Sequence, residues 1–325
     1  MKIKNLYIEE DILKDEKALR IQKKLRYENK IICKNYREVF NPKNQNFRIQ
    51  KKEPSVILAK KKKNLILEAP KKFNIGFSEN YYFSHMLNCI YDCNYCFLQG
   101  MFNSAHYVIF VNYDDFLLNI KDKLSNSSNN ICFFSGYDCD SLALEDMTGF
   151  IEYFVKKFVK LNNGTLEIRS KSTNIKSIKK YHPSNKIIPA FSLNPEYSIT
   201  LHEQNTPKLI NRINAIKELQ NLGWNIGIRF DPFIWYGELS KMSIYFEEIF
   251  KSINKNKIHS VTIGNFRMTN SYLKRMVKVN PTEPYILEKQ ISQILPSKND
   301  DTEIKITTIK EKISEFIDDS KIFIN

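Results

Sequence analysis

The sequence contains no run of 18 consecutive apolar residues, and its first residues lead into charge rather than into an apolar segment. A helix that crosses a membrane needs about 20 mostly apolar residues, and a secretory signal peptide needs an apolar segment near the N-terminus. Because neither feature is present, we expect a cytoplasmic protein without a membrane partner. The 42% of apolar residues is ordinary for a globular protein, and 325 residues can bury one large core.

Cysteine is also sparse, with six residues in the whole chain. Disulfide frameworks are typical of short, cysteine-dense secreted chains, so we do not expect one here. Three of the six thiols are scattered, and burial in the core is the simplest interpretation for them: Cys33, Cys132 and Cys139. The other three are clustered, which favours a metal site.

The clustered residues, Cys89, Cys93 and Cys96, form a C-x3-C-x2-C motif after an apolar run at 81–87. A loop here can turn three thiolates toward one centre. A closed structural zinc site takes four ligands, and most protein-bound 4Fe–4S clusters take four cysteines. Three thiolates on such a cluster would leave one iron open to a ligand from outside the protein. The alternative is a structural metal site, such as a zinc ribbon without its second pair of ligands.

Acidic residues are too few to balance the basic ones, since 36 Asp and Glu stand against 50 Lys and Arg and give a net charge of +14. Such an excess favours a polyanionic partner, with nucleic acid the first candidate. The chain is also visibly rich in Lys, Asn and Ile, as an AT-rich coding sequence would produce without selection for binding. Charge therefore supports a DNA partner only together with other features.

Residues 1–72 are expected to form a basic N-terminal extension. Two short apolar runs, at 55–59 and 65–68, flank four lysines at 60–63, a pattern typical of a hairpin with a lysine-rich connection. The ordinary interpretation of these lysines is a solvated turn, and contact with phosphate is the alternative.

From about residue 73 onward, strand-like runs alternate with helical segments, which is typical of βα units and a parallel sheet. About six units are too few to close an eight-stranded barrel. We therefore predict an α/β fold with a partial (β/α)6 barrel at 73–282 and a helical tail at 283–325; a doubly wound sheet is the alternative. The strands are expected at 81–87, 130–134, 165–169, 186–191, 224–230 and 259–263, and helices at 141–161, 207–222 and 242–254.

In either architecture the site belongs at the carboxyl ends of the strands. Polar residues should then follow the strands, and they do. The polar stretches lie at 135–141, 170–172, 192–194, 229–232 and 264–267.

The cysteine motif resembles that of the radical S-adenosylmethionine (SAM) superfamily, and C-F-L-Q at 96–99 is similar to the C-Y-L-Q of the spore photoproduct lyase family. Further similar segments follow in the same order, with D-S-L-A-L-E at 140–145, F-S-L-N-P-E-Y at 191–197 and F-R-M-T at 266–269. The resemblance extends over about 55–282. It implies a 4Fe–4S cluster, S-adenosyl-L-methionine bound at the open iron, and reduced flavodoxin or ferredoxin as electron donor.

The resemblance also implies residues that bind S-adenosylmethionine. Lys171 corresponds to a lysine near the cofactor, and Ser192 and Asn194 could hydrogen-bond its polar end. Asp140 and Ser141 could contact its ribose or amino group, and Ser135 lies where the superfamily has a glycine-rich turn. A helix N-cap is the simpler interpretation of Asp140 and Ser141. The cofactor candidates are Ser135, Asp140, Ser141, Lys171, Ser192 and Asn194.

Several positions depart from the family pattern. The cysteine that returns a hydrogen atom to the product corresponds to Tyr137, and the nearest thiol is Cys139. The tyrosine beside the last cysteine of the motif is Phe97 here, although Tyr95 remains. The tail lacks the Arg/Tyr/Gly-rich hairpin with which these lyases open the lesion. Tyr95, Tyr137 and Cys139 are accordingly the catalytic candidates.

We therefore expect a radical SAM lyase that abstracts hydrogen from a DNA base lesion. RNA or a peptide is the alternative substrate. A nucleic-acid-binding protein with a structural metal is the alternative without catalysis.

Overall fold

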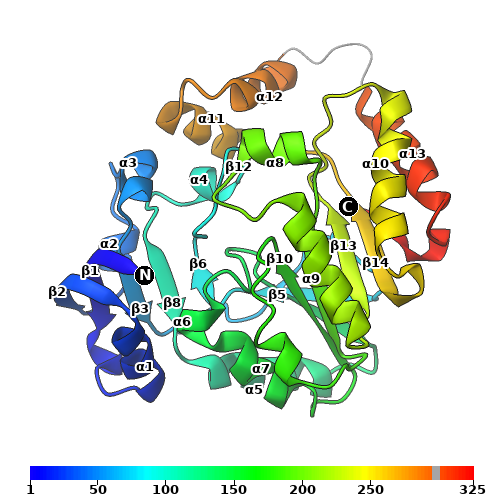
Figure 1. Cartoon of the computed structure of the whole chain (residues 1–325). Coiled ribbons are helices and arrows are strands. Elements are labelled where there is room, and N and C mark those ends of the chain that lie inside the picture. Colours follow the sequence, from blue (N-terminus) through cyan, green and yellow to red (C-terminus); the bar gives the residue numbers. More distant parts are fainter. Residues whose placement is uncertain (295–300) are drawn as a thin grey trace.

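The computed structural model describes residues 1–294 and 301–325. Its centre is an eight-stranded sheet that curls into a partial barrel, in the order β15-β14-β13-β11-β10-β9-β5-β4 (Figure 1). Neighbouring strands are parallel except for β4 and β5. The strands are β4 (Leu67–Glu68), β5 (Glu79–Phe83), β9 (Ile131–Ser135), β10 (Gly164–Ser170), β11 (Ile187–Ser192), β13 (Ile226–Phe230), β14 (Ile258–Ile263) and β15 (Ile322–Ile324).

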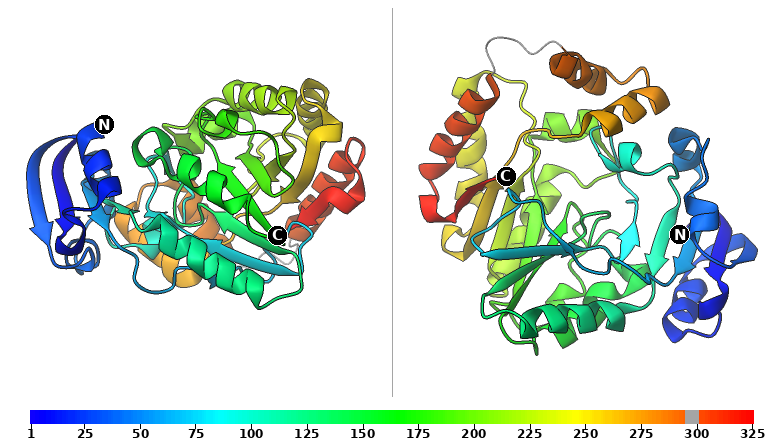
Figure 2. Two further views of the ribbon diagram at one scale, coloured as in Figure 1. Left: turned by 90° about the horizontal axis from the view of Figure 1, so that it is seen from below. Right: turned by 180° about the vertical axis from the view of Figure 1, so that it is seen from behind.

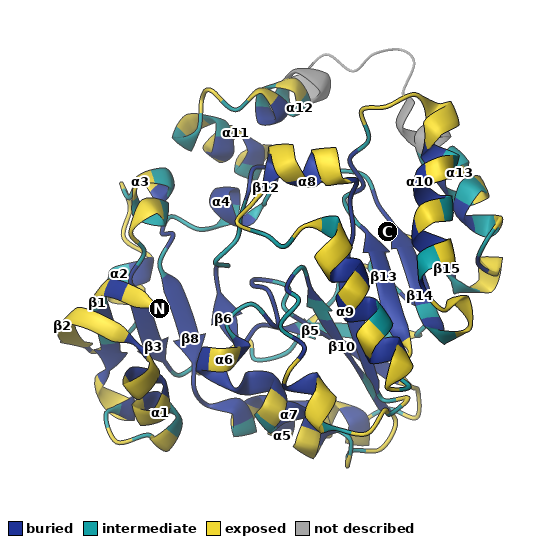
Figure 3. Cartoon of the chain, in the orientation of Figure 1, coloured by how far each residue is buried: buried dark blue, intermediate teal, exposed yellow. Residues whose placement is uncertain are grey.

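Helices surround the outside of this sheet, as the two further views in Figure 2 show. Their apolar faces and the strands form the main core, in which side chains such as Phe154, Ile216 and Phe246 are fully buried. Burial follows this division, with buried strands and helices that are exposed on their outer faces (Figure 3). The helices are α5 (Tyr113–Ser125), α6 (Glu145–Thr148), α7 (Phe150–Phe158), α9 (Leu209–Asn221), α10 (Leu239–Ser252) and α13 (Asp301–Ser314).

The six predicted strands are present as β5, β9, β10, β11, β13 and β14, and they neighbour one another in chain order. A doubly wound sheet would reverse its strand order at a switch point. The partial (β/α)6 barrel is therefore confirmed and the doubly wound alternative is wrong. The helices predicted at 207–222 and 242–254 are α9 and α10, whereas the segment 141–161 is broken into α6 and α7 at Gly149, which has a φ of 58°.

A second sheet of five strands lies beside the barrel, in the order β2-β1-β3-β8-β6. Only β6, against β8, is antiparallel. Ile8, Leu58 and Ile21, the last from α1 (Glu16–Lys24), belong to a separate core on this sheet. The strands are β1 (Lys2–Glu9), β2 (Arg26–Cys33), β3 (Val56–Ala59), β6 (Met86–Leu87) and β8 (Tyr107–Phe110).

The hairpin predicted around the lysines at 60–63 is wrong. The first apolar run becomes β3, which is fully buried between β1 and β8, whereas the second becomes β4 and pairs with β5. Each run finds its backbone partners in a different sheet, so the lysines connect the two sheets instead of turning between two paired strands. The domain limits at residues 72 and 282 stay predictions.

The C-terminal segment contains the expected helices, but it ends in β15, which the sequence analysis did not predict. β15 pairs with β14 and so extends the barrel sheet. In Figure 1, α11 and α12 lie over one end of the barrel near α4 and α8. No helix within the described ranges is long and apolar enough to cross a membrane. The remaining elements are α2 (Arg37–Phe40), α3 (Phe47–Lys52), α4 (Leu98–Met101), α8 (Glu196–His202), α11 (Asn270–Val279), α12 (Pro284–Ile294), β7 (Asp92–Cys93), β12 (Glu203–Gln204), η1 (Glu10–Ile12), η2 (Ile178–Lys180), η3 (Lys255–Lys257) and η4 (Asp319–Lys321).

A buried ion pair crosses the barrel interior. Glu167 on β10 pairs with Arg229 on β13 at 2.7 Å, and both side chains are 0% exposed. Arg229 also donates to Ser260 Oγ on β14 at 2.9 Å, and Arg169 donates to Glu167 at 2.8 Å. Burial alone would raise the pKa of Glu167, but the two arginines lower it to about 2. The carboxylate therefore links strands that are not neighbours in the sheet.

Replacing Glu167 by Gln should lower the free energy of unfolding by about 3–5 kcal/mol at pH 7, because Arg229 is left as an unpaired buried charge. Urea unfolding followed by circular dichroism measures the change. Glu218→Gln is the control, since it removes an exposed partner of Lys179, and it should cost less than about 1 kcal/mol. An equal, small effect of both substitutions would contradict the role given to the buried pair.

The same pair predicts a pH dependence. Because the pKa of Glu167 falls from 4.5 to about 2 on folding, its stabilisation is complete above the unfolded pKa and is lost as the pH falls toward the folded one. The difference in unfolding free energy between the wild-type protein and Glu167→Gln should therefore shrink between pH 4.5 and about 2. A difference that stays constant over this range would exclude an ionised Glu167.

Candidate functional site

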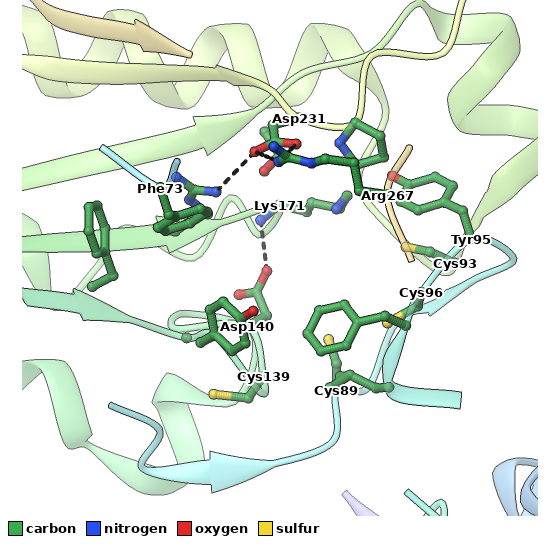
Figure 4. Close-up of a pocket in the computed structure, with 18 of the residues that line it drawn as sticks. Phe73, Cys89, Cys93, Tyr95, Cys96, Cys139, Asp140, Lys171, Asp231 and Arg267 are labelled. Carbon is green, nitrogen blue, oxygen red and sulfur yellow. Dashed lines mark hydrogen bonds and ion pairs between the residues drawn. The ribbon is translucent and has the colours of Figure 1, made fainter. Parts of the chain in front are cut away.

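A cavity of ≈ 570 Å³ opens at the carboxyl ends of the barrel strands, the edge at which such sheets bind ligands. Figure 4 shows the cysteine loop on one side of it and side chains from the strand ends on the other. Ser141 and Asn194 are the predicted site residues that do not line it. The predicted residues that do are Cys89, Cys93, Tyr95, Cys96, Ser135, Tyr137, Cys139, Asp140, Lys171 and Ser192.

The cysteine loop is anchored at both of its ends. At its start, Asn88 has a φ of 67° and turns the chain, and its Nδ2 donates to Ser104 O and His106 O at 2.7 and 2.8 Å. Within the loop, β7 pairs with β12, and Asn94 N donates to His202 O at 2.8 Å. The loop is thus held by the second sheet on one side and by the barrel on the other.

The side chains of Cys89, Cys93 and Cys96 reach the cavity wall (Figure 4). Burial raises the pKa of all three thiols, that of Cys89 to about 12, so thiolates would form here only when a metal centre displaces the protons. Within the described ranges, no three His, Cys, Asp or Glu side chains gather closely enough to hold one ion.

Lys171 extends from the end of β10 into the same cavity, with its Nζ 5.5 Å from the centre of the Tyr95 ring. Burial alone would lower the pKa of Lys171, but the Glu203 carboxylate and the nearby Cys93 raise it. Glu203 in turn accepts a hydrogen bond from Tyr95 and pairs with Arg212 at 2.5 Å, where both side chains are 0% exposed. Tyr95 is therefore part of a buried network behind the loop.

Asp140 has both carboxylate oxygens occupied by the protein. Oδ1 accepts from the backbone N–H groups of Leu142 and Ala143 at 3.0 and 2.9 Å and from Ser170 Oγ at 2.6 Å. Oδ2 accepts from the Lys171 backbone N–H at 2.7 Å. The residue therefore caps the turn that leads to α6 and joins it to the end of β10.

The turn after β9 is built on a contact between two serines. Ser135 Oγ lies 2.8 Å from Ser141 Oγ and donates to Glu167 O at 2.9 Å. Gly136 has a φ of 80°, and a Cβ there would lie 2.4 Å from Ser141 Oγ. Ser141 thus packs beneath the turn, where a side chain at position 136 would collide with it.

Ser192 and Asn194 follow β11 but take different positions. Ser192 lines the cavity, and its carbonyl accepts from Arg212 at 2.8 Å. Asn194 donates to Glu203 and to Pro232 O at 3.0 and 3.1 Å, and it accepts from the Ile234 N–H at 2.9 Å. The Asn194 amide therefore holds the loop after β13 in place.

The two candidates for hydrogen return point in different directions. The Tyr137 ring packs against Tyr82 and Phe97, with centroids 4.2 and 5.6 Å apart. Cys139 turns its sulfur away from the three clustered cysteines (Figure 4), toward His85 Nδ1 at 4.0 Å. Burial raises the pKa of the Cys139 thiol well above its ordinary value. Tyr137, rather than Cys139, faces the loop.

Two arginines and an aspartate complete the cavity wall, and the sequence analysis assigned them no role. Arg169 stacks over Phe73, 4.4 Å from its centroid, and lies 4.0 Å from Asp231, which also pairs with Arg267 at 3.2 Å. Arg169 Nη2 is buried without a hydrogen-bond partner in the described part of the chain. The predicted polar stretches at 229–232 and 264–267 contain Asp231 and Arg267, so the sequence placed both at the strand ends. It did not indicate that the two side chains form an ion pair.

The chain matches the family model described as spore photoproduct lyase over residues 4–282. A curated relative, the spore photoproduct lyase of Clostridium acetobutylicum, is 25% identical over 209 residues, which cover 63% of this chain and 61% of the relative. The matched part is thus less than two thirds of the length of that relative.

Solved structures of spore photoproduct lyase have the same fold. A double mutant with bound AdoMet and dinucleoside spore photoproduct has a TM-score of 0.80 at 15% identity, covering 99% of this chain and 98% of the other. The lyase complexed with dinucleoside spore photoproduct has a TM-score of 0.78 with the same coverage. At this identity the likeness concerns the fold, and the family rests on the match over 4–282, which includes the cysteine loop and the strand-end residues. The resemblance is confirmed, and the chain belongs to the spore photoproduct lyase family.

Proposed function

We propose that this protein is a radical SAM lyase that repairs a thymine lesion, the spore photoproduct, in DNA. The observation that carries the proposal is the position of the cysteine loop. The three clustered thiols line a cavity at the carboxyl ends of a partial barrel, together with the half-buried Lys171. Membership of the spore photoproduct lyase family supports the same activity.

In this proposal Cys89, Cys93 and Cys96 would hold a 4Fe–4S cluster as thiolates and leave one iron for S-adenosylmethionine. When bound, the two groups supply a carbon-centred radical that takes a hydrogen atom from the substrate. The chemistry of the donor set fits, because the three clustered thiols line a cavity of ≈ 570 Å³, while the sulfur of Cys139, the fourth cysteine of the lining, is turned toward His85. The predicted contact residues for S-adenosylmethionine that line the cavity are Ser135, Asp140, Lys171 and Ser192. Ser141 and Asn194, which were also predicted, do not line it and would act by holding the turn after β9 and the loop after β13.

The residues around the cofactors position groups and exclude water. Lys171 keeps its charge inside the protein because Glu203 raises its pKa, so it offers three donors to a carboxylate. Asp140 orients the backbone of Lys171, and Ser141 supports the turn after β9 through its contact with Ser135 Oγ. Phe97 and Tyr137 pack together over the cavity and keep water from a reactive centre.

The proposed substrate follows from the charge and the aromatic rings of the cavity. Lys71, Lys72, Arg169 and Arg267 line it together with Phe73. Cationic side chains suit the phosphates of a DNA strand, and an aromatic ring suits an unstacked base. The solved relatives with dinucleoside spore photoproduct make this lesion the first choice, ahead of RNA or a peptide.

An electron donor completes the proposed reaction, and reduced flavodoxin or ferredoxin is the class that we expect. The cytoplasmic location and the lack of a membrane partner likewise stay predictions from the sequence.

Anaerobic reconstitution of the wild-type protein should give about four irons per chain and, with dithionite and S-adenosylmethionine, 5′-deoxyadenosine. Cys93→Ala should bind clearly less iron and form no deoxyadenosine, because one ligand is missing. Iron analysis and chromatography measure the two. Cys33→Ala is the matched control, since Cys33 lies on β2 in the second sheet. Zinc without any deoxyadenosine in the wild-type protein would contradict the proposal.

Tyr137 is the proposed hydrogen donor to the product radical, because it faces the loop while Cys139 faces His85. With DNA that contains the spore photoproduct, Tyr137→Phe should lower the ratio of thymine formed to deoxyadenosine formed by about tenfold. This corresponds to a rise of about 1.4 kcal/mol in the activation barrier for hydrogen return. Cys139→Ala should change this ratio by less than about twofold on the same scale. The reverse order of effects would make the thiol the donor.

A further inference from the structure

The cysteine loop has a second open side. A shallow pocket of ≈ 10 Å³ lies between the loop and α3, and Phe47 and Lys51 line it together with Cys89, Cys93 and Cys96. The same three cysteines line the large cavity. The loop is therefore a thin partition between the interior of the barrel and the outer surface at α3 and α4.

The two sides of this partition offer different access. The large cavity is the side that would take the cofactors and the substrate, so a protein partner cannot approach the cysteines there while they are bound. Cys89 and Cys96 are only partly buried, and both line the outer pocket as well as the large cavity. Lys51 Nζ donates to the carbonyl of Cys89, and Gln99 Nε2 donates to Cys93 O at 2.8 Å. One layer of side chains thus separates the loop from solvent.

This outer surface is basic. We define the cysteine-loop face as the surface formed by α3, α4 and α11, which lie next to one another in Figure 1. α3 carries Arg48, Lys51 and the exposed Lys52, with one acidic residue, the exposed Glu53, at its C-cap. The nearby Asp92 is neutralised by Arg48 at 2.6 Å.

The other edge of the face has the same sign of charge. Lys274, Arg275 and Lys278 are exposed on α11, and Arg275 ties this helix to α4 by donating to Met101 O at 3.1 Å. On α3 itself, Ile49 is 67% exposed next to the basic residues of that helix in the sequence. An apolar contact inside a charged rim is the usual composition of a transient protein interface.

We propose that the cysteine-loop face docks a small acidic one-electron carrier protein, with the prosthetic group of the carrier next to the outer pocket. The inference rests on the proposed function, which requires a reductant. One electron leaves the carrier, which is oxidised, and enters the metal centre of the loop, which is reduced. No proton or group crosses this surface. Charge complementarity steers the encounter, and the partition of the loop keeps it away from the substrate.

DNA is also negatively charged, but the face suits it less well. A lesion has to reach the large cavity on the opposite side of the loop, where Phe73, Arg169 and Arg267 are found. The cysteine-loop face instead presents lysines around an isoleucine. DNA is therefore treated as a competing outcome of the experiment.

The test reverses two charges on the face in the full-length protein, in the double variant Lys52→Glu/Lys274→Glu. Neither residue lines the cavity or the outer pocket. The matched control is Lys121→Glu/Lys156→Glu, which makes the same change of charge at exposed positions of α5 and α7, on a different side of the barrel (Figure 1). The association rate with a purified flavodoxin is measured at low and high salt, and deoxyadenosine formation is measured with flavodoxin and with dithionite.

The face variant should associate with flavodoxin about tenfold more slowly than the control at low salt, with a weaker salt dependence. Its flavodoxin-driven deoxyadenosine formation should fall in parallel, while the dithionite-driven reaction should equal that of the control. Equal association rates of the two variants, or no binding of flavodoxin to the wild-type protein, would overturn the proposal. So would a loss of affinity for duplex DNA with unchanged flavodoxin binding.

Failure of the proposed function gives a different result. If the wild-type protein forms no deoxyadenosine with dithionite, the radical SAM assignment fails. The association rates need no turnover, so they still decide whether this face binds the carrier.

Discussion

The buried carboxylate of Glu203 connects the cysteine loop to the barrel. It lies on β12, which pairs with the strand that contains Cys93, and it receives hydrogen bonds from Tyr95, Asn194 and Arg212. A buried carboxylate is costly unless it is paired and fully hydrogen-bonded. The loop, the end of β11 and α9 must therefore meet in one arrangement. That arrangement places three thiols at one wall of the cavity and allows Lys171 to stay charged there.

Glu167 and Arg229 play a corresponding part deeper in the barrel. The Glu203–Arg212 and Glu167–Arg229 ion pairs are both fully buried. Together they add two specific polar contacts to an interior that would otherwise be held by apolar packing. The Glu203–Arg212 pair holds the end of β11 near the loop, because Arg212 also donates to Ser192 O. Glu167 of the other pair also accepts a hydrogen bond from Arg169. The Arg169 side chain stacks over Phe73, and both residues line the cavity. The position of an arginine that lines the cavity thus depends on a charge in the core.

The sequence allowed prediction of what depends on local spacing. The three cysteines and the six strands with polar ends were found because each pattern lies within a few residues. The second sheet was missed, because its parallel pairing joins strands far apart in the chain. Glu203 and Arg212 gave no signal either, since a charged residue looks solvated until its partner is known. The hairpin predicted around the lysines at 60–63 was wrong because the two apolar runs that flank them belong to different sheets.

The segment after α11 explains how this chain differs from the family pattern. In place of an Arg/Tyr/Gly-rich hairpin, Glu283 accepts from Asn94 of the cysteine loop at 2.8 Å. Tyr285 packs on His202 with ring centroids 4.9 Å apart. These contacts are directed at the cysteine loop and its anchor, so the segment supports that loop. Positive charge at the cavity wall comes instead from Arg169 and Arg267, which share Asp231.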